Sequence, residues 1–570
     1  MRTVVCLAGL CVAAALAWAP ATLAAPIPDG PNSLPAFVGK PAKPSPVFAP
    51  DPPRHPHMAP NGRSNIHDDA YMTDTYQGAG PLGNGITRTS TLLAHECASL
   101  TFDAKNRIVA ICVGLEAPVL EMFDPTTLES LASMPLPPRQ GVSTGVFTDF
   151  SGGGYFYLDD QDRVVVPTNN RHIYVIAETA QPGFELQRDY DLTTAVLPND
   201  KIVSALPDWA GRIWFASANG VVGYVDPTDG SAKSTDTGEP NGNSFAVDET
   251  GGVFIVTDKA MYRFDASPAG AVTTWREPYD NIGVKKPGQT EAGSGTTPTV
   301  MGSDHVAITD NADPMNVVVY KRAPQVDGSR LVCKVPVFVK GASDTDQSLI
   351  ATPTSIVAEN NYGYANPASV QNGHTTSPGL ERIDVGANGC RKVWHSDEVA
   401  PSVVPKLSLA NGIVYTYTKP ANPDGDDGWY LTALDFRTGK TLWKALAGEG
   451  LGYNNNYAPV TLGPDRAAYV GVLGGLVRLA DGSPTASRSA KPTLRLNARR
   501  FRDGRLRLSV GGRDRRYVRS VVYKAGKKRL GRSTKSPFRR IVRIRTRRLK
   551  AVVTMTDGRR YSVGRRVPRT

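Results

Sequence analysis

The sequence predicts an all-β protein, made of a β-propeller with seven to eight blades and a small C-terminal β-sandwich. One pattern of short strands and tight polar turns recurs between residues 95 and 482. Helical periodicity is nearly absent from this region, and the charge balance changes abruptly near residue 488. Because a single sheet cannot bury both of its faces, repeated sheets of this kind must pack around a common axis.

Eight copies of the pattern align on the start of their second strand. In each copy a strand, a polar turn and a β-branched strand precede a third strand, which often ends in Asp and a Thr/Gly turn. The aligned positions recur every 40 to 58 residues and are Ile108, Val164, Ile213, Val253, Val306, Ile356, Val414 and Ala468. The sixth copy is degenerate, so the pattern is compatible with both seven and eight blades.

The last copy has no obvious fourth strand before the chain leaves the repeat region. An open sheet edge would invite aggregation, so a ring needs a strand that closes it. The stretch GITRTSTLL, residues 85–93, alternates suitably and lies in the transitional segment 61–94. We therefore expect this stretch to supply the outer strand of the last sheet.

The segments before the repeat region are expected to lack a fold of their own. Residues 1–24 have the features of a signal peptide, with Arg2, a short apolar stretch and small residues before the cleavage site. Residues 25–60 are rich in proline, which blocks helices and sheet ladders, and are predicted to form a disordered tether. No later apolar run approaches the ~18 residues of a membrane span, so a secreted protein is expected.

Export makes the cysteine count informative. Two of the six cysteines lie in the predicted signal peptide, and an even number in an oxidising compartment predicts disulfides. The stretches ECASLTFD and RIVAICVG flank a turn and read as a hairpin that places Cys97 opposite Cys112. Cys333 would then pair with Cys390. Four buried free thiols are the alternative.

The C-terminal region has a very different charge from the rest of the chain. Residues 488–570 contain 30 Lys and Arg but 3 Asp and Glu, a balance of +27, whereas the remainder has a balance of −15. This step predicts a domain boundary, with a linker at 483–491 and a basic antiparallel β-sandwich at 492–570. Such a unit would bind anionic cell-wall polymers or lipid headgroups. Few aromatic residues are interleaved, so nucleic acid is not expected.

One repeat carries a family resemblance. ALDFRTGKTLW, residues 433–443, closely resembles the repeat of the quinoprotein, or PQQ-like, propellers, and weaker echoes lie at 224–230, 123–129 and 382–394. The resemblance implies the propeller fold. The family contains PQQ- and calcium-dependent dehydrogenases as well as non-enzymatic binding and assembly propellers. This chain lacks the adjacent cysteines that cap the quinone, so PQQ is not expected. The stretches PFRRIVRI and MTDGRRYSV resemble Ig-like modules of secreted bacterial proteins.

Polar residues are predicted to converge on one face of the ring. In a four-stranded blade, the second-to-third loops and the connections into each first strand share a face. Amides and carboxylates gathered there would suit a sugar or a calcium ion, whose ligands would be Asp310, Asp313 and Glu359. The candidate ligand-binding residues are Asn169, Asn170, Arg171, Asp310, Asn311, Asp313, Asn360, Asn361, Tyr362, Asn454, Asn455 and Asn456. The alternative is that these residues serve only as turn formers.

The sequence therefore favours an exported binding or scaffold propeller. Its polar face would bind a carbohydrate or protein ligand, and its basic module would attach to the cell envelope. The alternative is an enzyme at the same face, either a PQQ- and calcium-dependent sugar or alcohol dehydrogenase or a calcium-dependent lactonase-like hydrolase. No common catalytic motif appears, and a Ser/His/Asp triad is spatial rather than sequential. The stretch His67-Asp68-Asp69 is interpreted as incidental.

Overall fold

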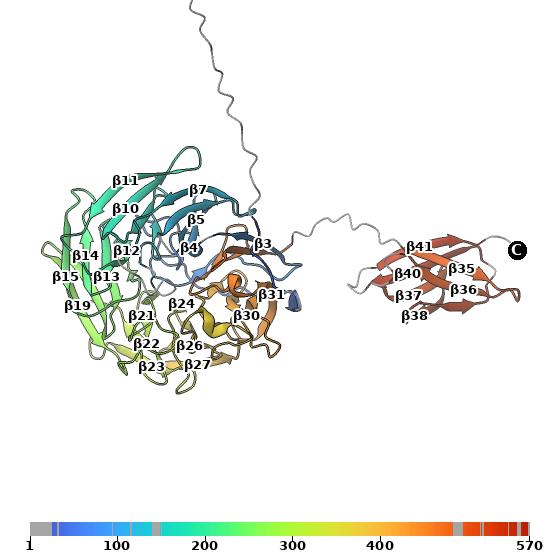
Figure 1. Ribbon diagram of the computed structural model, residues 1–570. Helices are drawn as coiled ribbons and strands as arrows, with labels where there is room; N and C mark the ends of the chain where they lie inside the picture. The colour runs from blue at the N-terminus through green and yellow to red at the C-terminus, as the bar shows by residue number, and fades with distance from the viewer. Residues whose placement is uncertain are drawn as a thin grey trace, which may run out of the picture. The chain divides into compact units, whose positions relative to one another are not determined.

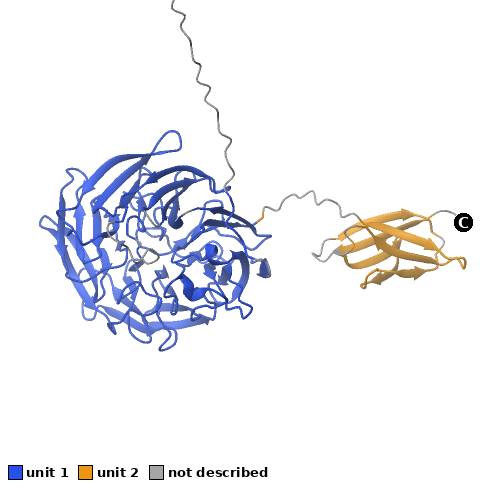
Figure 2. Cartoon of the chain, in the orientation of Figure 1, with its two compact units in different colours: residues 1–481 blue, residues 482–570 orange. Residues whose placement is uncertain are grey.

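The computed structural model describes residues 25–30, 34–93, 95–114, 117–139, 149, 151–482, 494–512, 515, 518–544, 546–555 and 560–567 (Figure 1). The chain divides into two compact units, Met1–Asp481 and Gly482–Thr570 (Figure 2). The predicted signal peptide and the predicted linker lie outside the described residues.

The first unit is a β-propeller, in which the sheets follow one another around a ring in chain order (Figure 1). Its described residues form eight sheets. Six of them are simple antiparallel meanders of four strands: β4–β7 (Glu96–Phe102, Ile108–Val113, Val119–Phe123, Ser130–Pro135), β8–β11 (Tyr157–Leu158, Val164–Pro167, His172–Glu178, Phe184–Asp191), β12–β15 (Ile202–Pro207, Ile213–Ser217, Val221–Val225, Ala232–Asp236), β16–β19 (Ala246–Val247, Val253–Val256, Ala260–Ser267, Gly270–Pro278), β20–β23 (Thr299–Met301, His305–Thr309, Asn316–Lys321, Leu331–Pro336) and β24–β27 (Ile350–Thr352, Ser355–Glu359, Leu380–Gly386, Gly389–Ser396).

The two remaining sheets of the ring are completed by N-terminal strands. One contains β28–β31 (Lys406–Ser408, Ile413–Thr418, Gly428–Asp435, Thr441–Glu449) with β1 (Phe37–Gly39) and β2 (Thr75–Tyr76) at its edges. The other contains β32–β34 (Val460–Leu462, Ala468–Val472, Gly475–Ala480) and β3 (Thr87–Leu92). Two short 3-10 helices, η1 (Pro367–Val370) and η2 (Leu451–Tyr453), lie in loops.

Strand β3 closes the ring in the way that the alternation of residues 85–93 predicts. It runs antiparallel to β34, with Thr87 opposite Ala480 and Leu92 opposite Gly475. In Figure 1 the blue strand β3 lies beside the orange strands of the last sheet. The N-terminal and C-terminal parts of the propeller are thus joined in one sheet.

The prediction of a disordered tether is wrong for residues 34–60. Strand β1 pairs with β31, and the backbone N–H groups of Ser45 and Val47 donate to the carbonyls of Asn411 and Leu409, each at 2.8 Å. Proline removes some donors but leaves the segment extended, so the remaining N–H groups can still pair with the ring, along β1 as a short ladder and at Ser45 and Val47 as single bonds.

Residues 64–76, here called the central segment, line the inside of the ring. Their carbonyl groups accept hydrogen bonds from the innermost strands of five sheets. The donors are the N–H groups of Leu158, Val247, Val300, Ala351, Leu407 and Leu409, at 2.8–3.0 Å. Asp68, Met72 and Asp74 have positive φ angles of 78°, 59° and 54°. These turns let the segment bend from one sheet to the next, and tertiary contacts must hold a backbone conformation that such residues disfavour.

The second unit contains two antiparallel sheets around one core. The sheets are β35-β36-β39 (Arg495–Arg500, Leu506–Gly511, Arg540–Val542) and β38-β37-β40-β41 (Lys528–Ser533, Val518–Ala525, Arg548–Met555, Arg560–Arg566). Their apolar side chains, including Leu496, Leu508, Val521 and Val553, are buried together. Basic residues alternate with these apolar positions along the strands, so the charge lies away from the core.

Both predicted disulfides are confirmed. Cys97 is bonded to Cys112, and Cys333 is bonded to Cys390. The residues that the structure describes include no helix with the length and apolar character that a membrane crossing requires.

Candidate functional site

The predicted loop residues of the sheet β24–β27 hold two connections together. Asn361 accepts hydrogen bonds from the hydroxyl of Thr345 and the backbone N–H of Asp346, at 3.0 and 2.9 Å. Asn360 accepts from the N–H groups of Asp344 and Tyr362, at 3.3 and 3.2 Å. Both asparagines are buried, so their amides fasten the loop after β25 to the connection that leads into β24.

The three consecutive asparagines 454–456 are also buried, although the sequence predicts them on the polar face of the ring. The hydroxyl of Tyr364 lies 3.0 Å from the side-chain oxygens of both Asn454 and Asn456. The amide of Asn455 donates to the carbonyls of Ser402 and Ala458, at 3.2 and 2.8 Å. Amides can be buried here because neighbouring loops supply their partners.

The predicted calcium ligands already accept hydrogen bonds from the protein. Asp310 accepts from the backbone and the side chain of Asn316, each at 2.7 Å. Glu359 accepts from Asn361 and Thr416, at 3.0 and 3.2 Å, and Asp313 accepts from the N–H of Gly341 at 2.7 Å. Among the described residues, no group of three or more His, Cys, Asp or Glu side chains is placed to hold a metal.

Two other predicted residues, Asn169 and Arg171, line a polar cleft of about 490 Å³, here called the side cleft. It lies between the sheets β8–β11 and β12–β15, and its lining includes Arg139, Asp149, Asn169, Arg171, Lys201 and Asn219. Asn311, from the sheet β20–β23, is buried elsewhere and donates to Asn281 and to the carbonyl of Val284, at 2.9 and 3.1 Å. Asn170 accepts from the Thr168 hydroxyl at 2.5 Å and is not part of the cleft lining.

The charged groups of the side cleft are largely paired. Lys201 donates to Asp149 at 2.8 Å, and Arg171 donates to the carbonyl of Val196 at 2.8 Å. Asn169 donates to the carbonyl of Pro137 at 3.2 Å, which leaves one of its two amide protons for another acceptor. Asp200 also lines the cleft and accepts from the N–H groups of Lys201 and Asn219, at 2.8 and 3.0 Å, while its second oxygen is buried without a partner among the described residues. The cleft therefore presents amides, a paired lysine and arginine, and one carboxylate held by backbone N–H groups.

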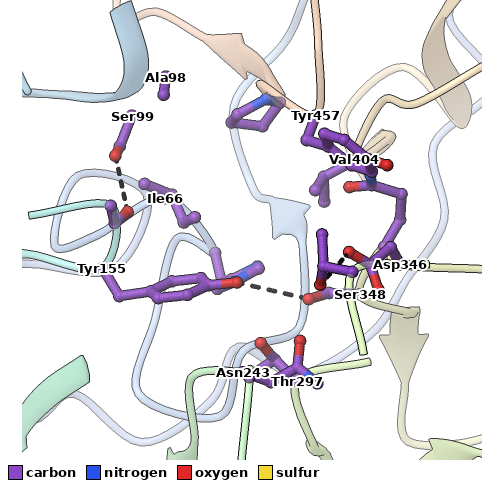
Figure 3. Close-up of a pocket in the computed structure, with 16 residues that line it drawn as sticks. Ile66, Ala98, Ser99, Tyr155, Asn243, Thr297, Asp346, Ser348, Val404 and Tyr457 are labelled. Carbon is purple, nitrogen blue, oxygen red and sulfur yellow. Dashed lines mark hydrogen bonds between the residues drawn. The ribbon is translucent and has the colours of Figure 1, made fainter. Parts of the chain in front are cut away.

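A second pocket lies on the axis of the ring, here called the axial pocket (Figure 3). It has a volume of about 40 Å³, and most of its lining comes from connections into the innermost strands. Its lining includes His67, Tyr155, Asn243, Asp346, Ser348 and Tyr457. Burial raises the pKa of Asp346 to about 7, although a hydrogen bond from Thr290 at 2.8 Å opposes the shift. Burial also raises the pKa of the Tyr155 hydroxyl, which therefore stays protonated and can donate.

The floor of the axial pocket contains a chain of buried polar groups from the central segment. Asp74 lies 3.0 Å from Nδ1 of His67, and Nε2 of His67 lies 3.5 Å from the hydroxyl of Ser348. Lys406 donates to Asp74 and to the carbonyl of Ile66. All of these side chains are buried.

No family model matches the chain. An uncharacterized protein of Archaeoglobus fulgidus is 30% identical over 381 residues, which cover 60% of this chain and 71% of the archaeal protein. This chain belongs to the family of that archaeal protein. Because the archaeal member is uncharacterized, the family assigns no activity to this chain.

The solved structures that resemble this chain are distant from it in sequence. Streptogramin B lyase has 10% identity and a TM-score of 0.36, with 69% of this chain and 97% of the other covered. The C-terminal WD40 domain of Sif2 has 10% identity and a TM-score of 0.42, covering 70% and 98%. The Dos1 propeller has 10% identity and a TM-score of 0.37, covering 56% and 74%.

Sequence reasoning missed the axial pocket. The sequence pattern indicates no role for His67, which is interpreted as incidental, and it indicates none for Asp74 or Ser348. The available signal was weak, because His67 and Asp74 are seven residues apart in a segment without a recognisable element, and Ser348 follows 281 residues after His67. Only the path of the central segment through the ring brings them together.

Proposed function

We propose that this protein is an exported binding propeller whose side cleft takes a carbohydrate. The observation that supports this proposal is the polar cleft of about 490 Å³, which falls within the range of roughly 300–1,000 Å³ typical of ligand pockets. Lys201 is paired to Asp149, Arg171 to a backbone carbonyl, and Asp200 to backbone N–H groups. Such a site favours a neutral ligand with many hydroxyl groups over a strongly charged one.

We also propose the number of blades, the kind of sandwich in the second unit and the location of the protein. The eight sheets of the first unit are eight blades, related to the PQQ-like propellers through the resemblance of residues 433–443. The second unit is an Ig-like sandwich, whose charge would attach the protein to anionic envelope polymers. The two disulfides agree with an extracellular location, where such bonds persist.

A glycan array with the chain from residue 25 onward tests the carbohydrate proposal. Isothermal titration would then compare wild type with Asn169→Ala and Asn219→Ala for any glycan that binds. We expect each substitution to weaken binding about 5- to 30-fold, since each removes hydrogen bonds worth about 1–2 kcal/mol. Asn388→Ala, an exposed position in the turn between β26 and β27, is the control and should bind as wild type does.

Two outcomes would count against the carbohydrate proposal. The first is an array on which no glycan binds while the protein is folded. The second is glycan binding that neither cleft substitution weakens, which would place the ligand elsewhere on the ring. Retention of a protein partner by the same cleft, lost in Asn169→Ala, would replace the carbohydrate with a protein ligand.

A further inference from the structure

The three groups Asp74, His67 and Ser348 form one line of contacts beneath the axial pocket. Asp74 Oδ1 and Oδ2 lie 3.0 and 3.2 Å from Nδ1 of His67. On the opposite edge of the imidazole, Nε2 of His67 faces the Ser348 hydroxyl at 3.5 Å. Ser348 belongs to the connection into β24, whereas both other residues belong to the central segment.

The order of these contacts defines the proton positions on the imidazole. A carboxylate can only accept a hydrogen bond, so the proton of a neutral His67 lies on Nδ1. Nε2 is then unprotonated and faces the serine hydroxyl, whose proton it can accept. This is the arrangement by which a histidine activates a serine nucleophile while a carboxylate orients the ring.

The pocket above Ser348 supplies two further requirements of acyl transfer. Tyr155 and Asn243 also line it, so the protonated hydroxyl and the second amide proton of Asn243, whose first goes to the carbonyl of Ser294 at 2.9 Å, are the donors open to a developing oxyanion. The volume of about 40 Å³ restricts the acyl group that can enter to a short one. The lining carries Asp346 but no arginine or lysine, so a neutral acyl group fits better than an anionic one.

Anchoring of the central segment does not by itself explain this arrangement. The backbone of that segment is already bonded to the innermost strands of five sheets, and Lys406 ties Asp74 to the sheet β28–β31. Neither role requires an acceptor nitrogen of His67 to face a serine in a pocket.

We propose that Ser348 is the nucleophile of an esterase site that cleaves short-chain carboxylic esters. His67 takes the hydroxyl proton as Ser348 Oγ bonds to the ester carbonyl carbon. When the bond from that carbon to the alcohol oxygen breaks, His67 gives the proton to the departing alkoxide. Water then attacks the acyl-serine and gives a proton to His67, which passes it to Ser348 Oγ as the carbon–Oγ bond breaks and the carboxylic acid leaves. Asp74 acts as a positioning residue, and no electron transfer is involved.

The first test is labelling of the chain from residue 25 onward with a fluorophosphonate, followed by peptide mass spectrometry, and hydrolysis of p-nitrophenyl acetate. We expect one adduct, on Ser348, and hydrolysis that Ser348→Ala abolishes and His67→Gln lowers by 10²-fold or more. Asp74→Asn should lower kcat at a nearly unchanged KM. Ser355→Ala is the control. Ser355, in β25, is also buried, but its hydroxyl donates to Asp384 at 2.8 Å instead of facing a histidine.

Circular dichroism shows which variants are folded. If a variant is not folded, labelling and ester hydrolysis of the wild-type protein test the proposal. Folded wild type that carries no adduct on Ser348 and hydrolyses the ester no faster than Ser348→Ala would overturn the proposal. An adduct on another residue would overturn it as well. Carbohydrate binding at the side cleft is independent of both results.

Discussion

Asp344 should make the stability of the propeller depend on pH. Its carboxyl group is buried in the connection into β24, and neither of its oxygens has a hydrogen-bond partner among the described residues. Burial raises its pKa from 3.8 to about 8, with a further contribution from Asp346 and an opposing one from Lys286. The folded protein therefore binds this proton more tightly than the unfolded chain does.

The sign and size of the effect follow from that difference in pKa. Stability is fully present below the unfolded pKa and is lost as the pH rises toward the folded pKa. Each unit between the two values costs about 1.4 kcal/mol, so the group removes about 3 kcal/mol between about pH 5 and pH 7. Asp344→Asn has no charge to bury, so its unfolding free energy should not contain this loss.

Urea unfolding of wild type and Asp344→Asn at several pH values measures the effect. The free energy of unfolding of the variant, relative to wild type, should rise by about 3 kcal/mol from about pH 5 to pH 7. Asp327→Asn, at an exposed position, should show no such trend. A constant difference between Asp344→Asn and wild type across this range would mean that Asp344 ionises normally, and the argument from burial would be refuted.

Four further outcomes can be measured by unfolding experiments. Removal of the Cys333–Cys390 bond by paired alanine substitutions should lower the free energy of unfolding by about 4 kcal/mol, since the bond closes a loop of 57 residues. Asn455→Ala should lower it by about 1–3 kcal/mol because two buried carbonyls lose their donor; an unchanged midpoint would return Asn455 to the role of a turn residue. Deletion of residues 61–93 should abolish the cooperative transition of the whole ring rather than fray one sheet. Calcium added after EDTA treatment tests the predicted metal ligands: a higher melting temperature would support them, and an unchanged one would count against them.

The parts of the fold that follow from local pattern could be predicted from the sequence. Alternation fixes which face of a strand is buried, so the hairpins and the closing strand β3 were recognisable. A regular hairpin predicts the Cys97–Cys112 pair, whereas in the structure an irregular hairpin brings the two residues together. Ser99 lies opposite Ile111 and Glu96 opposite Val113, with a bulge between them that shifts the register by one residue.

The parts that depend on distant partners could not be predicted. Whether an asparagine binds a ligand or fills a core depends on which loops lie against it, and Asn455 finds its acceptors in Ser402 and Ala458. The proline-rich segment likewise has too little periodicity to reveal that it packs on the ring. In both cases composition indicated exposed, irregular chain, whereas tertiary contacts decided the outcome.

The N-terminal segment links the closure of the ring to the formation of the axial pocket. Residues 87–92 complete the last sheet as β3, and the central segment, which ends 11 residues earlier in the sequence, carries both His67 and Asp74. Ser348 comes from the ring itself. The contact between His67 and Ser348 therefore exists only when the segment is docked inside the ring. Its backbone hydrogen bonds to the innermost strands hold it there, and β3 fixes the chain that follows it. A substitution that weakens β3 should consequently reduce labelling of Ser348 before unfolding of the two sheets that the Cys333–Cys390 bond joins. The stability of one edge strand is in this way connected to the chemistry proposed at the axis.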